Sequence, residues 1–208
     1  ATHTTLTDPG RVAHLLQELR RAGQEEAVQA LASRAATHTT LTDPGRVAHL
    51  LQELRRAGQE EAVQALLARD PTNPFGVAYL LQELRDAGQE EAVQALASRA
   101  ATHTTLTHPG GIAYLLQELR RAGQEEAVQA LASRAATHTT LTAPVGVALL
   151  LQELREAGQE EAVQALASRA ATHTTLTAPD GIALLLWELR EAGQEDAAKT
   201  VERRALDS

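Results

Sequence analysis

The chain has 208 residues, of which 43% are hydrophobic but only 2% aromatic, so its core must be built from Leu, Val, Ile and Ala. The formal net charge is −8 and Lys199 is the only lysine, which weighs against a general binder of nucleic-acid backbones. Cysteine is absent, which excludes disulfides and thiolate chemistry, and we expect a cytoplasmic location. The longest apolar stretch, Gly181–Trp187, is far shorter than the roughly 20 residues that span a bilayer.

One motif recurs six times along the chain. Each copy opens near a proline, and the spacing is 35 residues at every step but one: Pro9, Pro44, Pro74, Pro109, Pro144 and Pro179. A fixed period in this range indicates a solenoid, because a unit that cannot bury its apolar face alone stacks on its neighbours. We predict an all-α fold, an α-solenoid of six helix-turn-helix repeats with about twelve helices. It forms a single domain over 1–208, with repeats at approximately 1–35, 36–70, 71–100, 101–135, 136–170 and 171–208.

The first helix of a repeat is predicted over about residues 8 to 22. Thr7 stands two residues before the proline and is the expected N-cap, as are its five equivalents. One apolar face follows at helical spacing, formed by Val12, Leu15, Leu16, Leu19 and Ala22. Gly23 comes next and is expected to end the helix in the left-handed conformation.

The second helix follows at once. Glu25 and Glu26 occupy its first turn, where carboxylates are favoured by the helix dipole. Its predicted buried side consists of Ala27, Val28, Leu31 and Ala35. The threonine-rich segment 36–42 is poor helix material and is predicted to be the connector to the next repeat.

Two irregularities break the repetition. Five residues are missing from the second connector, which reads LLARDPTNP between Leu66 and Pro74. The last helix carries Thr200, Glu202 and Arg203 at positions that are Ala or Ser in repeat one, which is typical of a capping repeat. The chain starts in mid-repeat at Ala1, so we expect a fragment of a longer bacterial protein or an engineered array.

The Asp-Pro-x-Asn turn of that connector resembles the turn that joins tetratricopeptide-type helical hairpins. The 35-residue period and the AGQEEA turn also resemble pentatricopeptide repeats, and the Ala-rich units are similar to tandem repeats of large actinobacterial proteins. What these resemblances imply, over the whole chain, is an α-solenoid used for recognition.

The six copies differ mainly in four columns of the first helix, represented by residues 10, 14, 17 and 21. At about 100° per residue these columns form an outward stripe roughly 60° wide, opposite the core face. All four aromatic residues of the chain lie on this stripe. Exposed aromatic residues that share a surface usually mark a recognition site. By resemblance to tetratricopeptide hairpins, this stripe would line the ligand groove. The predicted partner-binding residues are His14, Arg21, His49, Arg56, Phe75, Tyr79, Tyr114, Arg121, Leu149, Leu184 and Trp187. Drift of solvent-facing positions after duplication predicts the same stripe.

A histidine recurs in the connector, at His3, His38, His103, His138 and His173. Equivalent atoms of stacked hairpins lie on the order of 10 Å apart, whereas zinc holds its ligands at about 2 Å. We therefore predict no metal site and expect each histidine to hydrogen-bond its connector to the neighbouring repeat. No activated nucleophile or phosphate-cradling glycine loop is present, so no cofactor and no enzyme activity are expected.

These observations favour a non-catalytic scaffold that binds a protein or peptide through the outward stripe. The alternative is a structural or engineered array that self-associates into a homo-oligomer through its apolar C-terminal half. RNA binding by analogy with pentatricopeptide repeats is a weaker alternative, because the chain is acidic. No membrane partner is expected.

Overall fold

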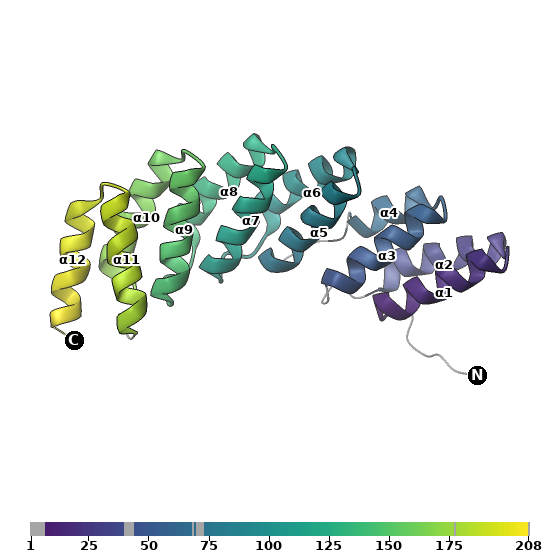
Figure 1. Ribbon diagram of the computed structural model, residues 1–208, viewed down its shortest axis with the longest axis horizontal. Coiled ribbons are helices and arrows are strands. Elements are labelled where there is room, and N and C mark those ends of the chain that lie inside the picture. The colour runs from purple at the N-terminus through teal and green to yellow at the C-terminus, as the bar shows by residue number, and fades with distance from the viewer. Residues whose placement is uncertain (1–6, 40–43, 68, 70–72, 177, 208) are drawn as a thin grey trace. The chain divides into compact units, whose positions relative to one another are not determined.

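The computed structural model describes residues 7–39, 44–67, 69, 73–176 and 178–207. These residues form twelve α-helices, joined in pairs by short turns (Figure 1). The array of helical hairpins predicted from the sequence is therefore confirmed. The chain divides into two compact units, Ala1–Pro71 with Tyr79–Leu96, and Thr72–Ala78 with Ala97–Ser208. We call them unit 1 and unit 2 and describe each by itself.

Unit 1 holds the first two repeats and part of the third. Its helices are α1 (Pro9–Arg21), α2 (Glu25–His38), α3 (Pro44–Arg56) and α4 (Glu60–Leu67), with residues 79–86 of α5 (Pro74–Asp86) and 90–96 of α6 (Glu90–His103). Helix α1 packs against α2 and α3, while α4 packs against α2 and α3. The first helix of each repeat is called an A helix below, and the second a B helix.

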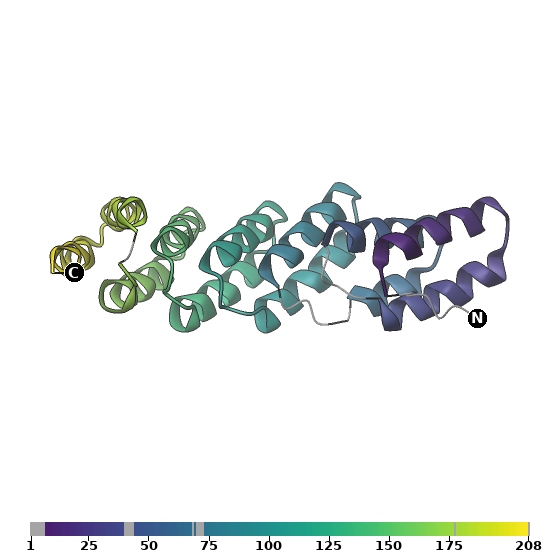
Figure 2. The same cartoon turned by 90° about the horizontal axis from the view of Figure 1, so that it is seen from below.

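Unit 2 holds the remainder of repeat three and three complete repeats. It contains residues 74–78 of α5, residues 97–103 of α6, α7 (Pro109–Arg121), α8 (Glu125–His138), α9 (Pro144–Glu156), α10 (Glu160–His173), α11 (Pro179–Glu191) and α12 (Glu195–Leu206). The A helices α7, α9 and α11 pack side by side in one layer, and α8 and α10 lie side by side in a second layer (Figure 2).

Each A helix ends as its glycine predicts. The six glycines after the A helices have φ between 66° and 70°, a region that is costly for residues with a Cβ. Around Gly123, the amide of Gln124 donates to the Leu119 carbonyl at 3.0 Å, and the Gly123 amide donates to the Arg120 carbonyl at 3.0 Å. These two bonds form a Schellman motif, which reverses the chain into the next B helix.

The predicted N-caps Thr7, Thr107 and Thr142 are wrong. Because the proline occupies the first helical position, the cap is the residue immediately before it. Asp8 caps α1 by accepting from the amides of Gly10 at 2.9 Å and Arg11 at 3.1 Å. Asn73 does the same before α5, accepting from the amide of Phe75 at 3.0 Å. Of the threonines, Thr42, Thr72 and Thr177 lie outside the described residues.

The connector is shorter than predicted, because the B helices of four repeats continue through the histidine. Helix α2 ends at His38 rather than at Ala35, and Ala36 is buried. The helical extension brings Ala36 into the core, Ala32 is buried as well beside Val28 and Leu31, and Ala27 is only half-buried. Small alanines on this face let neighbouring B helices approach closely.

The terminal repeats reveal which side of an A helix faces which neighbour. Leu185 in the last repeat is fully buried, whereas its counterpart Leu15 in the first repeat is 44% exposed. This column therefore packs against the preceding repeat. The prediction that Leu15 lies in the core is wrong, although it holds for the equivalents in repeats two to six. The column of Ala13 shows the opposite pattern: Ala13 in the first repeat is buried, and its counterpart Ala183 in the last repeat is exposed. This column therefore packs against the following repeat.

Within the described residues, no helix combines the length and apolarity needed to cross a membrane.

Candidate functional site

The outward row is the set of A-helix positions equivalent to residues 10, 14, 17 and 21. In unit 1 it carries polar and charged side chains that are exposed, His14, Arg21, His49 and Arg56, together with Tyr79 of α5. Arg56 donates to Glu53 at 2.6 Å, and Arg21 donates to Glu18 at 2.9 Å. Both arginines are therefore held by a carboxylate of their own helix, while the two histidines face solvent.

In unit 2 the outward row combines apolar side chains with polar and charged ones. Phe75 is 49% exposed, Leu149 is 41% exposed and Trp187 is 54% exposed, whereas Tyr114 and Leu184 are half-buried. These five side chains come from α5, α7, α9 and α11, and Val145 of α9 is also exposed. We call these six residues the apolar stripe of unit 2. The predicted residue Arg121 lies in the same row and donates to Glu118 at 2.6 Å.

The two aromatic rings at the start of the stripe pack on each other. The centroids of Phe75 and Tyr114 lie 6.5 Å apart, with an angle of 34° between the rings. This separation is within the range of favourable aromatic pairs. A Cβ placed on Gly111 would lie 2.9 Å from Cε2 of Phe75, so the glycine leaves the space that the phenyl ring fills. Phe75 therefore has a packing role in addition to its exposed surface.

A glycine again faces a larger side chain between repeats five and six. A Cβ on Gly181 would lie 3.1 Å from Cγ2 of Val145 and 2.8 Å from Cγ of Pro144. In unit 1 the order is reversed, because Gly10 lies beside the Arg46 side chain, with its Cβ position 3.3 Å from Arg46 Cδ. A large residue in one repeat thus faces a glycine in its neighbour.

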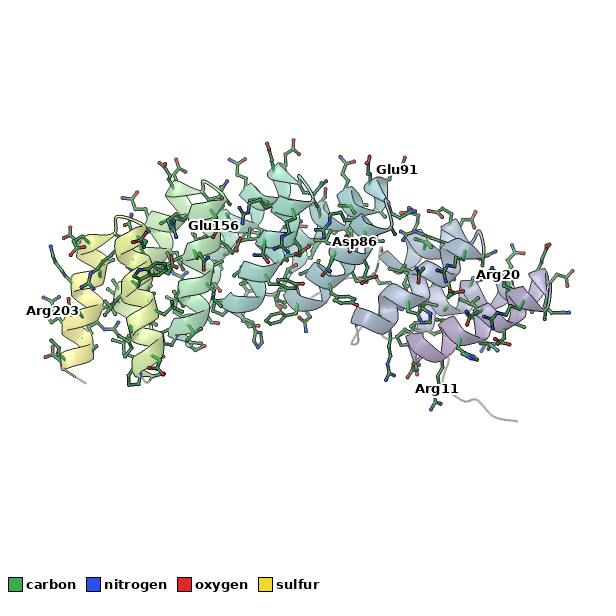
Figure 3. The ribbon with its side chains drawn as sticks, in the orientation of Figure 1. Arg11, Arg20, Asp86, Glu91, Glu156 and Arg203 are labelled. Atoms are coloured by element: carbon green, nitrogen blue, oxygen red, sulfur yellow. The ribbon has the colours of Figure 1, made fainter. Side chains whose placement is uncertain are left out.

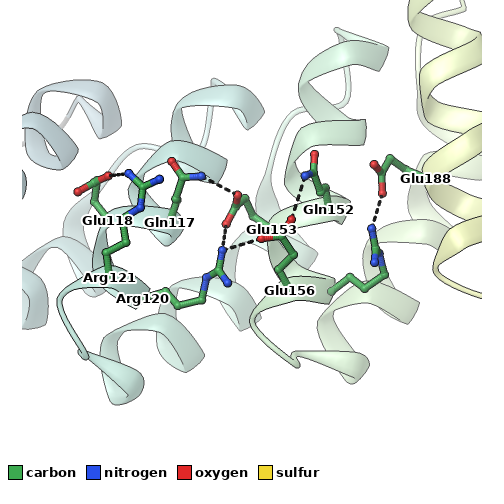
Figure 4. Close-up of polar contacts among 9 residues, drawn as sticks. Gln117, Glu118, Arg120, Arg121, Gln152, Glu153, Glu156 and Glu188 are labelled. Carbon is green, nitrogen blue, oxygen red and sulfur yellow. Dashed lines mark hydrogen bonds and ion pairs between the residues drawn. The ribbon is translucent and has the colours of Figure 1, made fainter.

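A polar network borders the stripe on its α7 and α9 side (Figure 4). Arg120 of α7 donates to Glu153 at 3.2 Å and to Glu156 at 2.7 Å, both on α9. Gln117 donates to Glu153 at 3.1 Å, and Gln152 donates to Glu156 at 2.9 Å. Arg120 is thereby fixed between two carboxylates and contributes little free positive charge to the surface.

The pKa values of the carboxylates in and near this network depend on how deeply each is buried. Desolvation raises the pKa of Glu153, and the nearby charge of Glu156 adds to the effect, against the pull of Arg120. Glu188 on α11 is the equivalent residue one repeat later, and burial likewise raises its pKa. Exposed Glu156 behaves oppositely, because hydrogen bonds from Gln152 and Arg120 lower its pKa.

Glu18 of repeat one is exposed and pairs with Arg21 of its own helix at 2.9 Å. Equivalent glutamates Glu53, Glu118, Glu153 and Glu188 are buried. An arginine of the preceding repeat pairs with several of them: Arg20 with Glu53 at 3.6 Å, Arg120 with Glu153 at 3.2 Å, and Arg155 with Glu188 at 3.4 Å. These ion pairs connect adjacent A helices.

A second set of arginines connects adjacent B helices. Arg169 of α10 donates to the carbonyls of Ala136 at 2.7 Å and Thr139 at 2.9 Å, at the end of α8. Arg204 of α12 donates in the same way to Ala171 and Thr174 at the end of α10. These carbonyls have no partner within their own helix, so the arginine of the next repeat satisfies them.

The hydrogen-bonding role that we predicted for the connector histidines thus belongs to arginine. His38, His103, His138 and His173 are exposed at the last residue of their B helices, and His3 lies outside the described residues. In the described part of the chain, no three His, Asp or Glu side chains gather in a group that could hold a metal ion.

Two hollows lie at the edge where A helices turn into B helices, next to the last position of the outward row. One of about 530 Å³ in unit 1 is lined by Arg20, Glu25, Glu26 and Arg56. Its counterpart in unit 2, of about 560 Å³, is lined by Arg155, Glu160, Glu161 and Glu191. In unit 1, Glu91 lies at the start of α6, beside the turn that joins α5 to α6 (Figure 3). Because these hollows are open and polar and recur with the repeat, we attribute them to the shape of the turns.

A scan of protein-family models finds none that matches the chain, and a search of curated proteins finds no match either. The finding that stands is the repeated all-α array itself.

Proposed function

We propose that this chain is a non-catalytic scaffold that binds a protein or peptide through the outward row of its A helices. The observation that carries the proposal is the exposure of Phe75, Leu149 and Trp187 in unit 2, on helices that also bury a separate apolar face. Because these side chains are about half exposed, burying the rest of each would contribute on the order of 1 kcal/mol, and neighbouring exposed apolar side chains usually mark a contact surface.

The charges around the stripe favour a polypeptide over RNA. A phosphate backbone is bound by free arginine and lysine side chains. In unit 2, however, Arg120, Arg121 and Arg155 already pair with carboxylates of the A helices. Binding to RNA would require these pairs to break, and two of the carboxylates are buried.

Selection of binders from a random peptide display library tests the proposal. We expect enriched peptides to bind the wild-type protein and to lose most of their affinity for the variant Tyr114→Ser, Leu149→Ser, Trp187→Ser. The matched control replaces exposed residues of the B helices, Gln129→Ala, Ser133→Ala and Gln164→Ala, and should leave binding unchanged. Equal binding to both variants, or no enrichment at all, would contradict a recognition role for the stripe.

Self-association is the second candidate, because a second copy would also cover exposed apolar side chains. Light scattering over a concentration series separates the two functions. We expect a monomer at every concentration. A dimer that forms with rising concentration and disappears in the serine variant would assign the stripe to self-association.

A further inference from the structure

The last A helix, α11, differs from the others in what its outward row carries. Asp180, Leu184, Trp187 and Glu191 follow at intervals of four, three and four residues, which places them on one face within about 60°. An acidic residue therefore stands at each end of the row, with the exposed indole of Trp187 between them. The corresponding row of α9 reads Val145, Leu149, Gln152 and Glu156.

The arginines of α9 and α11 pair with carboxylates other than Asp180 and Glu191. Arg155 of α9 donates to Glu188 at 3.4 Å, and Arg190 of α11 donates to Glu202 of α12 at 3.2 Å. Among the described residues, by contrast, neither Asp180 nor Glu191 takes part in an ion pair or a side-chain hydrogen bond, and both are exposed. The outward face of α11 is therefore apolar in the middle and carries uncompensated negative charge at both ends.

The pKa of Glu188 on the same helix reflects both its burial and the charges near it. Desolvation is the largest cause that raises the pKa of Glu188, and the negative charges of Glu191 and Glu156 add to the rise. Arg155 lowers the pKa through its hydrogen bond and its charge, and each of these effects is larger than that of either carboxylate.

This chemistry complements a cationic side chain. Trp187 and Glu191 are four residues apart on one helix, where side chains are neighbours. An indole face attracts a lysine or arginine head group, and a carboxylate beside it adds an ion pair to the same cation. The methylene stem of the cationic residue would lie over Leu184 and Trp187, as long charged side chains do on apolar surfaces.

From this arrangement, and resting on the proposed function, we infer that the partner is a peptide segment in which apolar residues are followed by lysine or arginine. Its apolar residues contact the stripe over α7 and α9, and its cationic side chain contacts Trp187 and Glu191 of α11.

The chain supplies its own reporter, because Trp187 is its only tryptophan. The probes are three acetylated, amidated peptides with identical Leu and Ala positions, whose remaining positions are all Lys, all Gln or all Glu. Each is titrated into the full chain at low salt while the fluorescence of Trp187 is followed. We expect the Lys peptide to bind more tightly than the Gln peptide, and the Glu peptide to bind weakest. The preference for Lys should shrink as salt is added.

Two variants locate the preference. Glu191→Gln is expected to weaken the Lys peptide about two- to fivefold, the range of an exposed ion pair, and to leave the Gln peptide unchanged. Glu161→Gln is the control, since Glu161 is an exposed carboxylate at the start of α10, outside the outward row.

The possible results distinguish a failure of the cationic partner from a failure of the scaffold function. Equal binding of the Lys and Gln peptides, or a Lys preference that survives Glu191→Gln, would overturn the cationic partner and leave the scaffold function in place. If none of the three peptides changes Trp187 fluorescence at millimolar concentration, and the display selection also fails, both conclusions fall.

Discussion

Arg169 of α10 donates a hydrogen bond of 2.9 Å to the backbone carbonyl of Thr139, which is 30 residues earlier and directly follows α8. Arg134 and Arg204 make the equivalent bond to Thr104 and Thr174. Each of these arginines closes the C-terminus of the preceding B helix. The stacking of hairpins in unit 2 is thus fixed by a polar contact between repeats as well as by apolar burial.

Arg169→Ala should destabilise the protein, because it removes hydrogen bonds to two helix-end carbonyls. Hydrogen bonds from charged groups contribute about 1.5–3 kcal/mol each, so we expect a loss of about 2–3 kcal/mol in the free energy of unfolding. Urea denaturation measures it. The control is Arg34→Ala, the exposed member of the same column in repeat one, which should change stability by less than about 0.5 kcal/mol. An equal loss in both variants would contradict the role assigned to Arg169.

Gly111→Ala and Gly110→Ala are neighbouring substitutions in α7 with opposite expected effects. At Gly111 the new methyl group would meet Cγ of Pro74 at 2.8 Å, so the repeats must move apart at a cost of about 1–3 kcal/mol. At Gly110 the nearest atom is 3.9 Å away, and alanine should stabilise the helix by about 0.5–1 kcal/mol. Thermal unfolding of the two variants measures the difference, and a stabilised Gly111→Ala protein would show that the repeats do not pack this closely.

Glu153→Gln should change how stability depends on pH. Because the pKa of Glu153 is raised in the folded protein, folding favours its protonated form. As pH rises from 4.5, the ordinary pKa of a glutamate, through the raised pKa of Glu153, the wild type should therefore lose stability relative to the glutamine variant. Urea unfolding of both proteins between pH 4 and pH 8 gives the difference. A difference that grows in favour of the wild type with rising pH would mean that the pair with Arg120 outweighs desolvation.

Trp187→Ala and Leu185→Ala test the orientation of α11. Leu185 is fully buried, so its truncation should cost about 2–5 kcal/mol. Trp187 is 54% exposed, and its replacement should cost less than about 1.5 kcal/mol and leave the helical circular-dichroism signal nearly unchanged. The triple variant Tyr79→Ala, Tyr114→Ala, Trp187→Ala should also keep its helicity. Comparable losses for Trp187→Ala and Leu185→Ala would place the indole in the core.

The architecture could be predicted because it is encoded locally and repeated. The apolar spacing of the A helix and the glycine at its end identify a hairpin without knowledge of any distant contact. The exposure of Leu15 could not be read from its own repeat, since its column is buried by the repeat before it. The N-cap was misplaced by one residue, because proline at the first helical position decides which residue caps.

The contacts between repeats were the main omission. Glu18, Arg20 and Arg34 head three columns that are identical in all six copies, while the outward row varies. That identity was a usable signal, but its meaning depends on a partner 30 or 33 residues away, which helical periodicity does not reveal. The outward row was easier to find, because variation among copies within one helix marks its exposed face.

Backbone-amide NMR of the protein with a peptide from the display selection tests the central claim most directly. We predict that the largest chemical-shift changes fall on the outward row of the A helices in unit 2, around Tyr114, Leu149, Leu184 and Trp187. The B-helix positions Gln129, Ser133 and Gln164 should stay unchanged. Shifts concentrated on α8 and α10, with the outward row unaffected, would contradict the account.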